Sequence, residues 1–249
     1  MKRNLNPCLL VSLIAGLGIS ASANATFGLG AGVGFGIEPY RNYDSSALPI
    51  PILYYDSDTF YYRGLTGGYH LYKDRINTLS FVAFYNPLQF KPEDAKDWSM
   101  KQLNKRKSSI MAGMKYQNQS RFGIVKLMMA ADIIDNSNGV LADLSYGYRF
   151  NFGNASITPE IGSYWNSKKY NKYYFGIDGG EAQRSGLAHY SPGASWLPYV
   201  GLGYRHKVNN HITVALKGQV TKLSDEIKDS PMVSRSYQSS LFFGANYTF

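Results

Sequence analysis

The stretch SLFFGANYTF, Ser240–Phe249, decides the fold, because large apolar residues recur there at every second position. Successive side chains of a β-strand point to opposite faces, so this spacing gathers the apolar residues on one face. That face carries Leu241, Phe243, Ala245, Tyr247 and Phe249, and the other carries Ser240, Gly244, Asn246 and Thr248. The alternation predicts a strand with one side in an apolar environment and the other side in a polar one.

The same period of two recurs along the chain. It is clear in residues 77–85, 139–150, 155–165, 196–206 and 211–222. These segments are longer than most strands of soluble proteins and suit tilted strands that cross a membrane. Their charges, among them Arg149, Glu160 and Arg205, fall on the less apolar face. A charge that faces lipid costs roughly 2–4 kcal/mol at the middle of the bilayer, so we expect these three side chains inside a barrel.

Short and long connections alternate between the predicted strands, as they do between the two ends of a membrane barrel. The sequence therefore predicts an all-β fold, a transmembrane antiparallel up-and-down β-barrel of about ten strands. Two further segments, Pro49–Tyr55 and Lys172–Ile177, raise the number to twelve if both cross the membrane. We expect the last strand to pair with Phe27–Phe35, because an open edge leaves backbone groups unsatisfied in lipid. A soluble sandwich or lipocalin-like barrel is the alternative, with the apolar face turned inward.

The N-terminus has the form of a secretory signal peptide. A basic start, Met1-Lys2-Arg3, precedes the apolar run Cys8–Ile19 and the small-residue motif SASANA. We expect cleavage after Ala25, which gives a signal peptide of residues 1–25 and an outer-membrane barrel of residues 26–249. Cys8 is the only cysteine, so the exported chain would contain no disulfide. Export through the periplasm to the outer membrane also argues against nucleic acid as a partner.

The net charge favours anionic neighbours. Removal of Lys2 and Arg3 lowers the formal charge from +9 by two, to +7. We expect contact with outer-membrane lipid and with the phosphates of lipopolysaccharide, for which the basic stretch KQLNKRK, Lys101–Lys107, is the candidate. The final aromatic residues, Tyr247 and Phe249, resemble the signal that the barrel-assembly machinery reads. That machinery is therefore a second expected partner.

Few residues have the spacing of a catalytic or metal site. The four histidines, His70, His189, His206 and His211, form no metal-binding motif. Ser185 and His189 are close in sequence, but nucleophilic catalysis also needs a residue that orients the base. We therefore expect no enzyme activity, no catalytic residue, no bound metal and no cofactor.

Several blocks of the chain resemble the MltA-interacting protein/OmpV family. The blocks are EPYRNY (38–43), LPIPILYYDSDTFYYRG (48–64), DNSNG (135–139), YYFGI (173–177), EAQRSGLAHYSPGA (181–194) and WLPYV (196–200). They follow the family's order over essentially the whole exported chain. Asn42 departs from the pattern, since many relatives have glycine at this position.

The resemblance implies a non-enzymatic outer-membrane scaffold that joins a murein lytic transglycosylase to a murein synthase. It supplies no catalytic residues. Arg41, Glu181 and Arg184 fall in predicted outer loops, and a Glu181–Arg184 or Arg41 network folded into the barrel would form a plug. Two alternatives stay open. One is a small channel lined by residues such as Tyr164 and Tyr199, and the other is a surface protein for adhesion or stress response, functions to which other family members are linked.

Overall fold

The computed structural model describes residues 25–43 and 47–249, so the predicted signal peptide lies outside the described residues apart from Ala25. The strands are β1 (Thr26–Ile37), β2 (Ala47–Asp56), β3 (Phe60–Arg63), β4 (Thr66–Lys73), β5 (Asn77–Asn86), β6 (Ser109–Ser120), β7 (Gly123–Asp132), β8 (Val140–Gly147), β9 (Phe150–Phe152), β10 (Ala155–Asn166), β11 (Ser195–Lys207), β12 (Ile212–Lys222) and β13 (Tyr237–Thr248). The helices are η1 (Pro92–Asp94), α2 (Trp98–Lys101), α3 (Lys168–Phe175), α4 (Gly179–Ser185) and α5 (Asp225–Lys228). Among these helices there is none long and apolar enough to cross a membrane.

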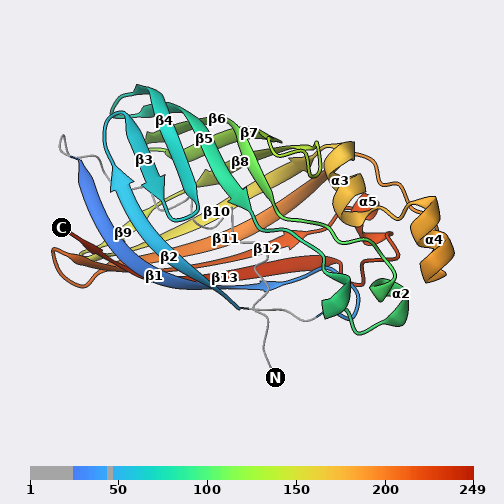
Figure 1. Ribbon diagram of the computed structural model, residues 1–249. Coiled ribbons are helices and arrows are strands. Elements are labelled where there is room, and N and C mark those ends of the chain that lie inside the picture. The colour runs from blue at the N-terminus through green and yellow to red at the C-terminus, as the bar shows by residue number, and fades with distance from the viewer. Residues whose placement is uncertain (1–24, 44–46) are drawn as a thin grey trace.

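All the strands belong to one antiparallel sheet that closes on itself (Figure 1). Strands that follow one another in the chain lie side by side, and the first strand, β1, pairs with the last, β13. β9 continues the line of β8 along the same neighbour, β10, so the wall has twelve strand positions. The predicted up-and-down barrel is confirmed, with the alternative number of twelve strands in place of the favoured ten.

The two additional wall positions lie in residues 47–73. β2 contains Pro49–Tyr55 and forms one strand of the wall. Lys172–Ile177, the other segment considered as an additional strand, lies mainly in helix α3. The second addition is the β3–β4 hairpin, in which the chain reverses at Gly64. Gly64 has a φ of 63°, a left-handed conformation that glycine adopts without steric cost. The outward-facing residues change at this turn from even-numbered positions, Phe60 and Tyr62, to odd-numbered ones, Tyr69 and Leu71. Only four residues of β3 precede the turn, so the alternation there is too short to mark it from the sequence.

The alternation of the sequence separates the outside of the barrel from the inside. Phe81 and Phe243 point outward and are 53% and 51% exposed, whereas the adjacent Val82 and Phe242 point inward and are 3% and 1% exposed. Large apolar side chains cover the outer surface of most strands. An apolar surface of this extent is suited to lipid.

The final strand lies at the seam that closes the barrel. β13 pairs with β1 in a register that places Tyr247 beside Leu29. The ring of Phe249 stacks on Phe27 with 5.4 Å between centroids, and both rings face outward. Tyr247 and Phe249 therefore lie on the lipid-facing surface next to the seam.

The two ends of the barrel differ in the length of their connections. One end has short turns at residues 57–59, 74–76, 121–122, 153–154 and 208–211. The other end carries the long connections and all the helices (Figure 1). Membrane barrels of this kind have short periplasmic turns and longer outer loops, so we name the two ends periplasmic and outer on that basis.

Replacing Gly64 by alanine is expected to lower the free energy of unfolding by about 1–2 kcal/mol, because a side chain disfavours the left-handed conformation by that amount. The measurement is urea unfolding of the refolded barrel, followed by tryptophan fluorescence. Gly179→Ala is the control, since a Cβ added there meets no atom within 4 Å. Equal effects of the two substitutions would contradict the assignment of the turn.

Candidate functional site

A cluster of charged side chains lies inside the barrel. Glu160 Oε2 is 3.0 Å from Lys126 Nζ and 3.8 Å from Lys217 Nζ. The hydroxyl oxygen of Tyr199 is 2.9 Å from Asp143 Oδ1 and 3.2 Å from Glu160 Oε1. The five residues come from five different strands, β7, β8, β10, β11 and β12. We call them the lumen charge cluster.

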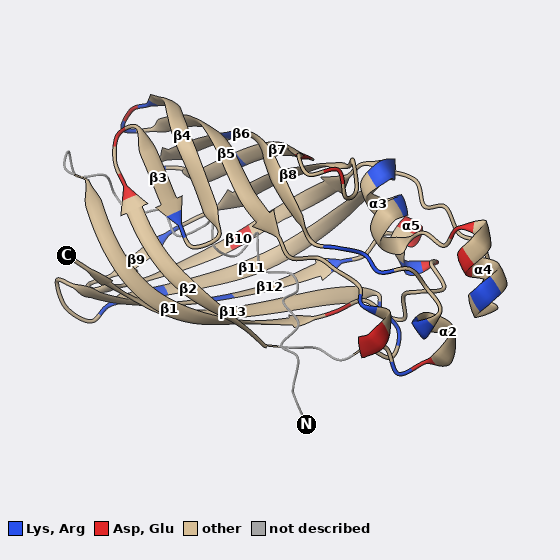
Figure 2. Ribbon diagram, viewed as in Figure 1, with Lys and Arg blue, Asp and Glu red and all other residues tan. Residues whose placement is uncertain are grey.

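The lumen charge cluster follows from the two faces of the strands. A charge on the lipid face is costly, and a charge inside the barrel is tolerated when it is paired. Lys126, Lys217 and Glu160 have side chains that are 14%, 6% and 8% exposed, so the pairs are largely shielded from water. Figure 2 shows that charged residues are sparse along the strands and more frequent in the turns and outer loops. The cluster therefore fills and connects the middle of the barrel.

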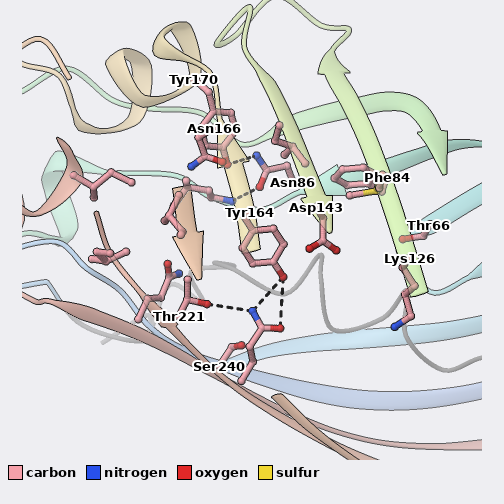
Figure 3. Close-up of a pocket in the computed structure, with 18 of the residues that line it drawn as sticks. Thr66, Phe84, Asn86, Lys126, Asp143, Tyr164, Asn166, Tyr170, Thr221 and Ser240 are labelled. Carbon is pink, nitrogen blue, oxygen red and sulfur yellow. Dashed lines mark hydrogen bonds between the residues drawn. The ribbon is translucent and has the colours of Figure 1, made fainter. Parts of the chain in front are cut away.

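A cavity of about 140 Å³ lies between this cluster and the outer connections (Figure 3). Apolar side chains make up most of its wall: Val82, Phe84, Met128, Leu141 and Leu197 from the strands, and Leu88, Phe175, Leu223 and Ile227 from the connections. Lys115, Lys126, Asp143 and Glu160 contribute the charged part of the lining. The cavity thus combines an apolar wall with a charged side.

Hydrogen bonds hold the polar side chains along the cavity wall. The Gln219 side-chain nitrogen donates to Tyr164 Oη at 3.1 Å and is 3.2 Å from Thr221 Oγ1. Asn86 Nδ2 donates to Tyr170 Oη at 3.0 Å. These contacts are drawn in Figure 3 and join strands that are far apart in the sequence. They fix the positions of polar groups that a ligand in the cavity would meet.

The outer connections pack together over the barrel as a hydrophobic cap. Its side chains Tyr40, Phe90, Met100, Tyr174, Ile177, Ile227 and Met232 are each at most 1% exposed. The hydroxyl of Tyr40 donates to the main-chain oxygen of Tyr174 at 3.3 Å. Because Leu88, Phe175, Leu223 and Ile227 belong to both the cap and the cavity wall, the cap forms the outer side of the cavity.

A buried ion pair ties two loops of the cap together. Arg106 Nη2 is 2.8 Å from Glu181 Oε1, and it also donates to the main-chain oxygen of Gly176 at 3.0 Å. Glu181 is in turn bonded to Asp178 through a capping box at the start of α4. The N–H of Asn104 donates to the same carboxylate at 2.7 Å. This carboxylate therefore holds residues 104–106 against α4.

The predicted loop network has different partners from those expected. Glu181 pairs with Arg106 in place of Arg184 or Arg41. Arg184 donates to Asn104 Oδ1 at 2.9 Å near the surface, and Arg41 is 2.6 Å from Asp97. All of these contacts lie in the cap, where the connections fold over the barrel. The expected pairing was wrong because spacing along the chain does not determine which loops meet in space.

The basic stretch 101–107 is also divided by the fold. Arg106 is 6% exposed and neutralises Glu181, so it is not available to lipopolysaccharide. Lys101, Lys105 and Lys107 remain exposed at the outer end. The sequence signal that distinguishes Arg106 is weak, because its partner lies 75 residues away.

Arg149 and Arg205 lie inside the barrel with Glu160, but they stand nearer the periplasmic end. Arg149 lies between β8 and β9, and Arg205 lies on β11 beside Ser156 of β10. Glu160 is the member of the predicted set that the structure places in the lumen charge cluster. Lys126 was not singled out from the sequence, although it occupies an inward position in the alternating segment GIVKLMM. The same periodicity that indicated Glu160 could have identified it.

Ser185 and His189, the pair considered from the sequence, have different surroundings in the structure. Ser185 is buried and donates its hydroxyl to the main-chain oxygen of Glu181 at 2.6 Å, while His189 is exposed. No group of three or more His, Cys, Asp and Glu side chains within residues 25–43 and 47–249 could hold a metal ion. The Ser185 hydroxyl therefore forms hydrogen bonds within the last turn of α4 and the residues that follow it.

Sequence comparison agrees with this architecture. The family model described as MltA-interacting protein MipA matches residues 29–249, which includes the whole barrel wall after the start of β1. The chain belongs to the MipA family. A protein of Escherichia coli (strain K12) named MltA-interacting protein is 40% identical over 85% of each chain. Outer membrane protein OmpV of Vibrio cholerae is 28% identical over 56% of this chain and 54% of its own.

Other MipA relatives carry names that refer to the same compartment. The putative outer membrane protein YiaT of Escherichia coli (strain K12) is 38% identical over 85% of this chain and 86% of its own. Among solved structures, an outer membrane channel from Pseudomonas putida F1 has a TM-score of 0.49 and 12% identity, with 94% of this chain and 98% of that chain covered. The MipA-family chain described here is an outer-membrane protein.

Replacing Glu160 by glutamine is expected to lower the free energy of unfolding by about 3 kcal/mol, because it removes the carboxylate that pairs with both buried cations, Lys126 and Lys217. Urea unfolding of the refolded barrel measures the effect. Asp58→Asn is the matched control, since Asp58 is 72% exposed and lies 3.6 Å from Lys73. That exposed pair should contribute less than about 1 kcal/mol. Similar losses for both variants would exclude a special role for the buried cluster.

Replacing Arg106 by glutamine is expected to loosen the cap and leave the barrel wall folded, because it leaves a buried carboxylate unpaired at the outer end. Limited proteolysis of intact cells, followed by mass spectrometry, should show faster cutting within residues 87–108. Arg235→Gln removes the same charge from an exposed position of the outer end and should leave the cutting rate unchanged. Equal protection of all three proteins would show that the ion pair does not hold the cap.

Proposed function

We propose that this chain is a non-enzymatic scaffold of the outer membrane that holds a murein lytic transglycosylase and a murein synthase together. The observation that carries the proposal is the 40% identity, over 85% of both chains, to a protein named for its interaction with MltA. The family model matches residues 29–249, which include the turns of the periplasmic end. A partner of this kind reaches the barrel from the periplasm.

The filled interior supports a role that depends on the surfaces of the barrel. The lumen charge cluster occupies the middle of the barrel, and the cap packs over the outer end. Paired buried charges and a close-packed apolar cap both oppose the free passage of water and ions. We therefore favour docking at the periplasmic end over conduction through the barrel.

The periplasmic turns present charges that a partner could bind. Arg75, Arg121 and Lys207 are exposed at this end. Asp74 accepts hydrogen bonds from the N–H groups of Asn77 and Ile76, which hold the pKa of Asp74 below its ordinary value. The turn at residues 74–76 is therefore ordered and charged near neutral pH. We propose that the three cations bind acidic side chains of a murein enzyme.

Two other partners belong to the proposal. Lys101, Lys105 and Lys107 are exposed at the outer end, where they suit the phosphates of lipopolysaccharide. Tyr247 and Phe249 lie on the lipid-facing side of β13, where the barrel-assembly machinery would meet them during insertion. These contacts would serve the insertion of the barrel and its position in the outer membrane, whereas the scaffold role uses the periplasmic end.

Crosslinking in intact cell envelopes, affinity capture and mass spectrometry test the scaffold. We expect a lytic transglycosylase and a murein synthase to be enriched with this protein relative to an unrelated outer-membrane barrel. Replacement of Arg75, Arg121 and Lys207 by glutamine should reduce both by several-fold. The matched control replaces Lys101, Lys105 and Lys107 by glutamine, which removes the same charge from the outer end. Recovery of other barrels and lipopolysaccharide without a murein enzyme would overturn the proposal.

A further inference from the structure

The barrel wall is incomplete on one side of the cavity. β3 pairs with β2 only at Tyr54–Asp56, and the N–H of Gly64 donates to the main-chain oxygen of Leu53 at 3.0 Å. The second strand of the hairpin, β4, pairs with β5 from its first residue, because Thr66 lies opposite Phe84 near the outer end of β5. β2 continues beyond the hairpin tip, residues 64–65, toward the outer end. Residues 47–52 therefore have β1 as a neighbour and no β3 partner in the sheet.

Two prolines occupy the edge of β2 that faces this gap. Backbone groups of alternate strand residues point to the same side, so Pro49 and Pro51 face the side on which Leu53 bonds to Gly64. Proline has no N–H, so these positions carry no donor that the missing strand would have satisfied. Proline at a strand edge also prevents the addition of a further strand. The sequence of β2 is thus suited to a permanent gap.

The gap lies at the level of the membrane. Pro51 and Pro49 pair across β1–β2 with Ala31 and Val33, which lie in the middle of the lipid-facing row of β1. Figure 1 shows the inner surfaces of β10, β11 and β12 between β2 and the β3–β4 hairpin.

Apolar side chains close the gap on its inner side. Leu65, at the hairpin tip, packs with Ile52 against Ile50 of β2 and Phe242 of β13. The next residue, Thr66, lines the cavity together with Val82 and Phe84. The hairpin tip therefore separates the cavity from the membrane by side-chain packing, without the strand pairing that closes the rest of the wall.

We propose that the cavity binds a small molecule of single-ring size that enters from the membrane between β2 and the hairpin tip. An apolar cavity of about 150 Å³ accommodates one benzene molecule, so the 140 Å³ here fits an aromatic or alicyclic ring. Entry from the membrane selects a molecule that dissolves in lipid and carries no net charge. The apolar contacts of Val82, Phe84 and Leu141 bind the ring.

Polar groups of the wall define the rest of the ligand. Asn86, Asn166 and Gln219 line the same cavity and offer amide donors and acceptors. In Figure 3, Asn86, Tyr164 and Asn166 lie around the same space, with Phe84 on its other side. A ring with one hydroxyl group matches this combination, because the hydroxyl can bond to an amide while the ring contacts the apolar wall. The proposal is independent of the scaffold, which concerns the periplasmic turns.

The probe for the test is 4-fluorophenol, and ¹⁹F NMR of the full barrel in lipid nanodiscs reports both binding and exchange. We expect saturable binding above that of empty nanodiscs. Val82→Trp fills the cavity and should abolish binding, whereas Ala83→Trp places the same bulk on the lipid-facing side and should not. Heat-modifiable migration on gels confirms that both variants are folded. Absence of saturable binding to the unaltered protein, or equal binding by both variants, would overturn the site.

The route is tested with Ile50→Cys combined with Leu65→Cys, two positions of the same apolar cluster. The exported chain is expected to contain no other cysteine, so oxidation or a short bismaleimide joins the hairpin tip to β2 specifically. We expect the exchange rate of bound probe to fall several-fold in the crosslinked protein, with unchanged occupancy at equilibrium. Reduction of the disulfide should restore the rate, and Ile50→Cys alone is the control. An exchange rate that is unaffected by the crosslink would exclude entry through the gap.

Discussion

The structure depends on the need to pair backbone N–H and C=O groups where lipid offers no hydrogen-bonding partner. An open sheet cannot meet this need, because its two edges would face hydrocarbon. Pairing of β13 with β1 removes both edges, and the stacked rings of Phe27 and Phe249 cover the seam from the lipid side. Once the sheet is closed, successive side chains of each strand point alternately to the lipid and to the lumen. The apolar outer surface and the polar interior both follow from that geometry.

The interior then has to neutralise the charges that the closed sheet turns inward. Glu160 does so with Lys126 and Lys217, while Tyr199 connects Glu160 to Asp143. The pairing fills the middle of the barrel, and the cap fills its outer end with aromatic and aliphatic side chains. Between the two, the packing leaves a cavity. The scaffold role that we propose places the docking surface at the periplasmic turns of this barrel.

The β3–β4 hairpin is the place where the wall departs from complete pairing. It stops at Leu53 on β2, and Pro49 and Pro51 remove two donors from the edge that is left. The substitution of side-chain packing for strand pairing costs hydrogen bonds, but it gives the membrane a route to the cavity. Gly64 permits the tight reversal, and Leu65 closes the gap against Ile50 and Phe242. A local turn thus decides whether the interior communicates with lipid.

The sequence by itself determined the class of fold and the two faces of its strands, because a period of two is a local property that survives without knowledge of partners. It placed Phe243 toward lipid and Glu160 toward the lumen, and it indicated an apolar final strand. The tertiary structure alone decided the pairing of Arg106 with Glu181, 75 residues apart, and the partners of Lys126. It also decided the number of strands, since the four-residue alternation of β3 is too short to mark the turn at Gly64 from the sequence. Register, strand tilt and loop packing set these features, and they arise only when distant segments meet.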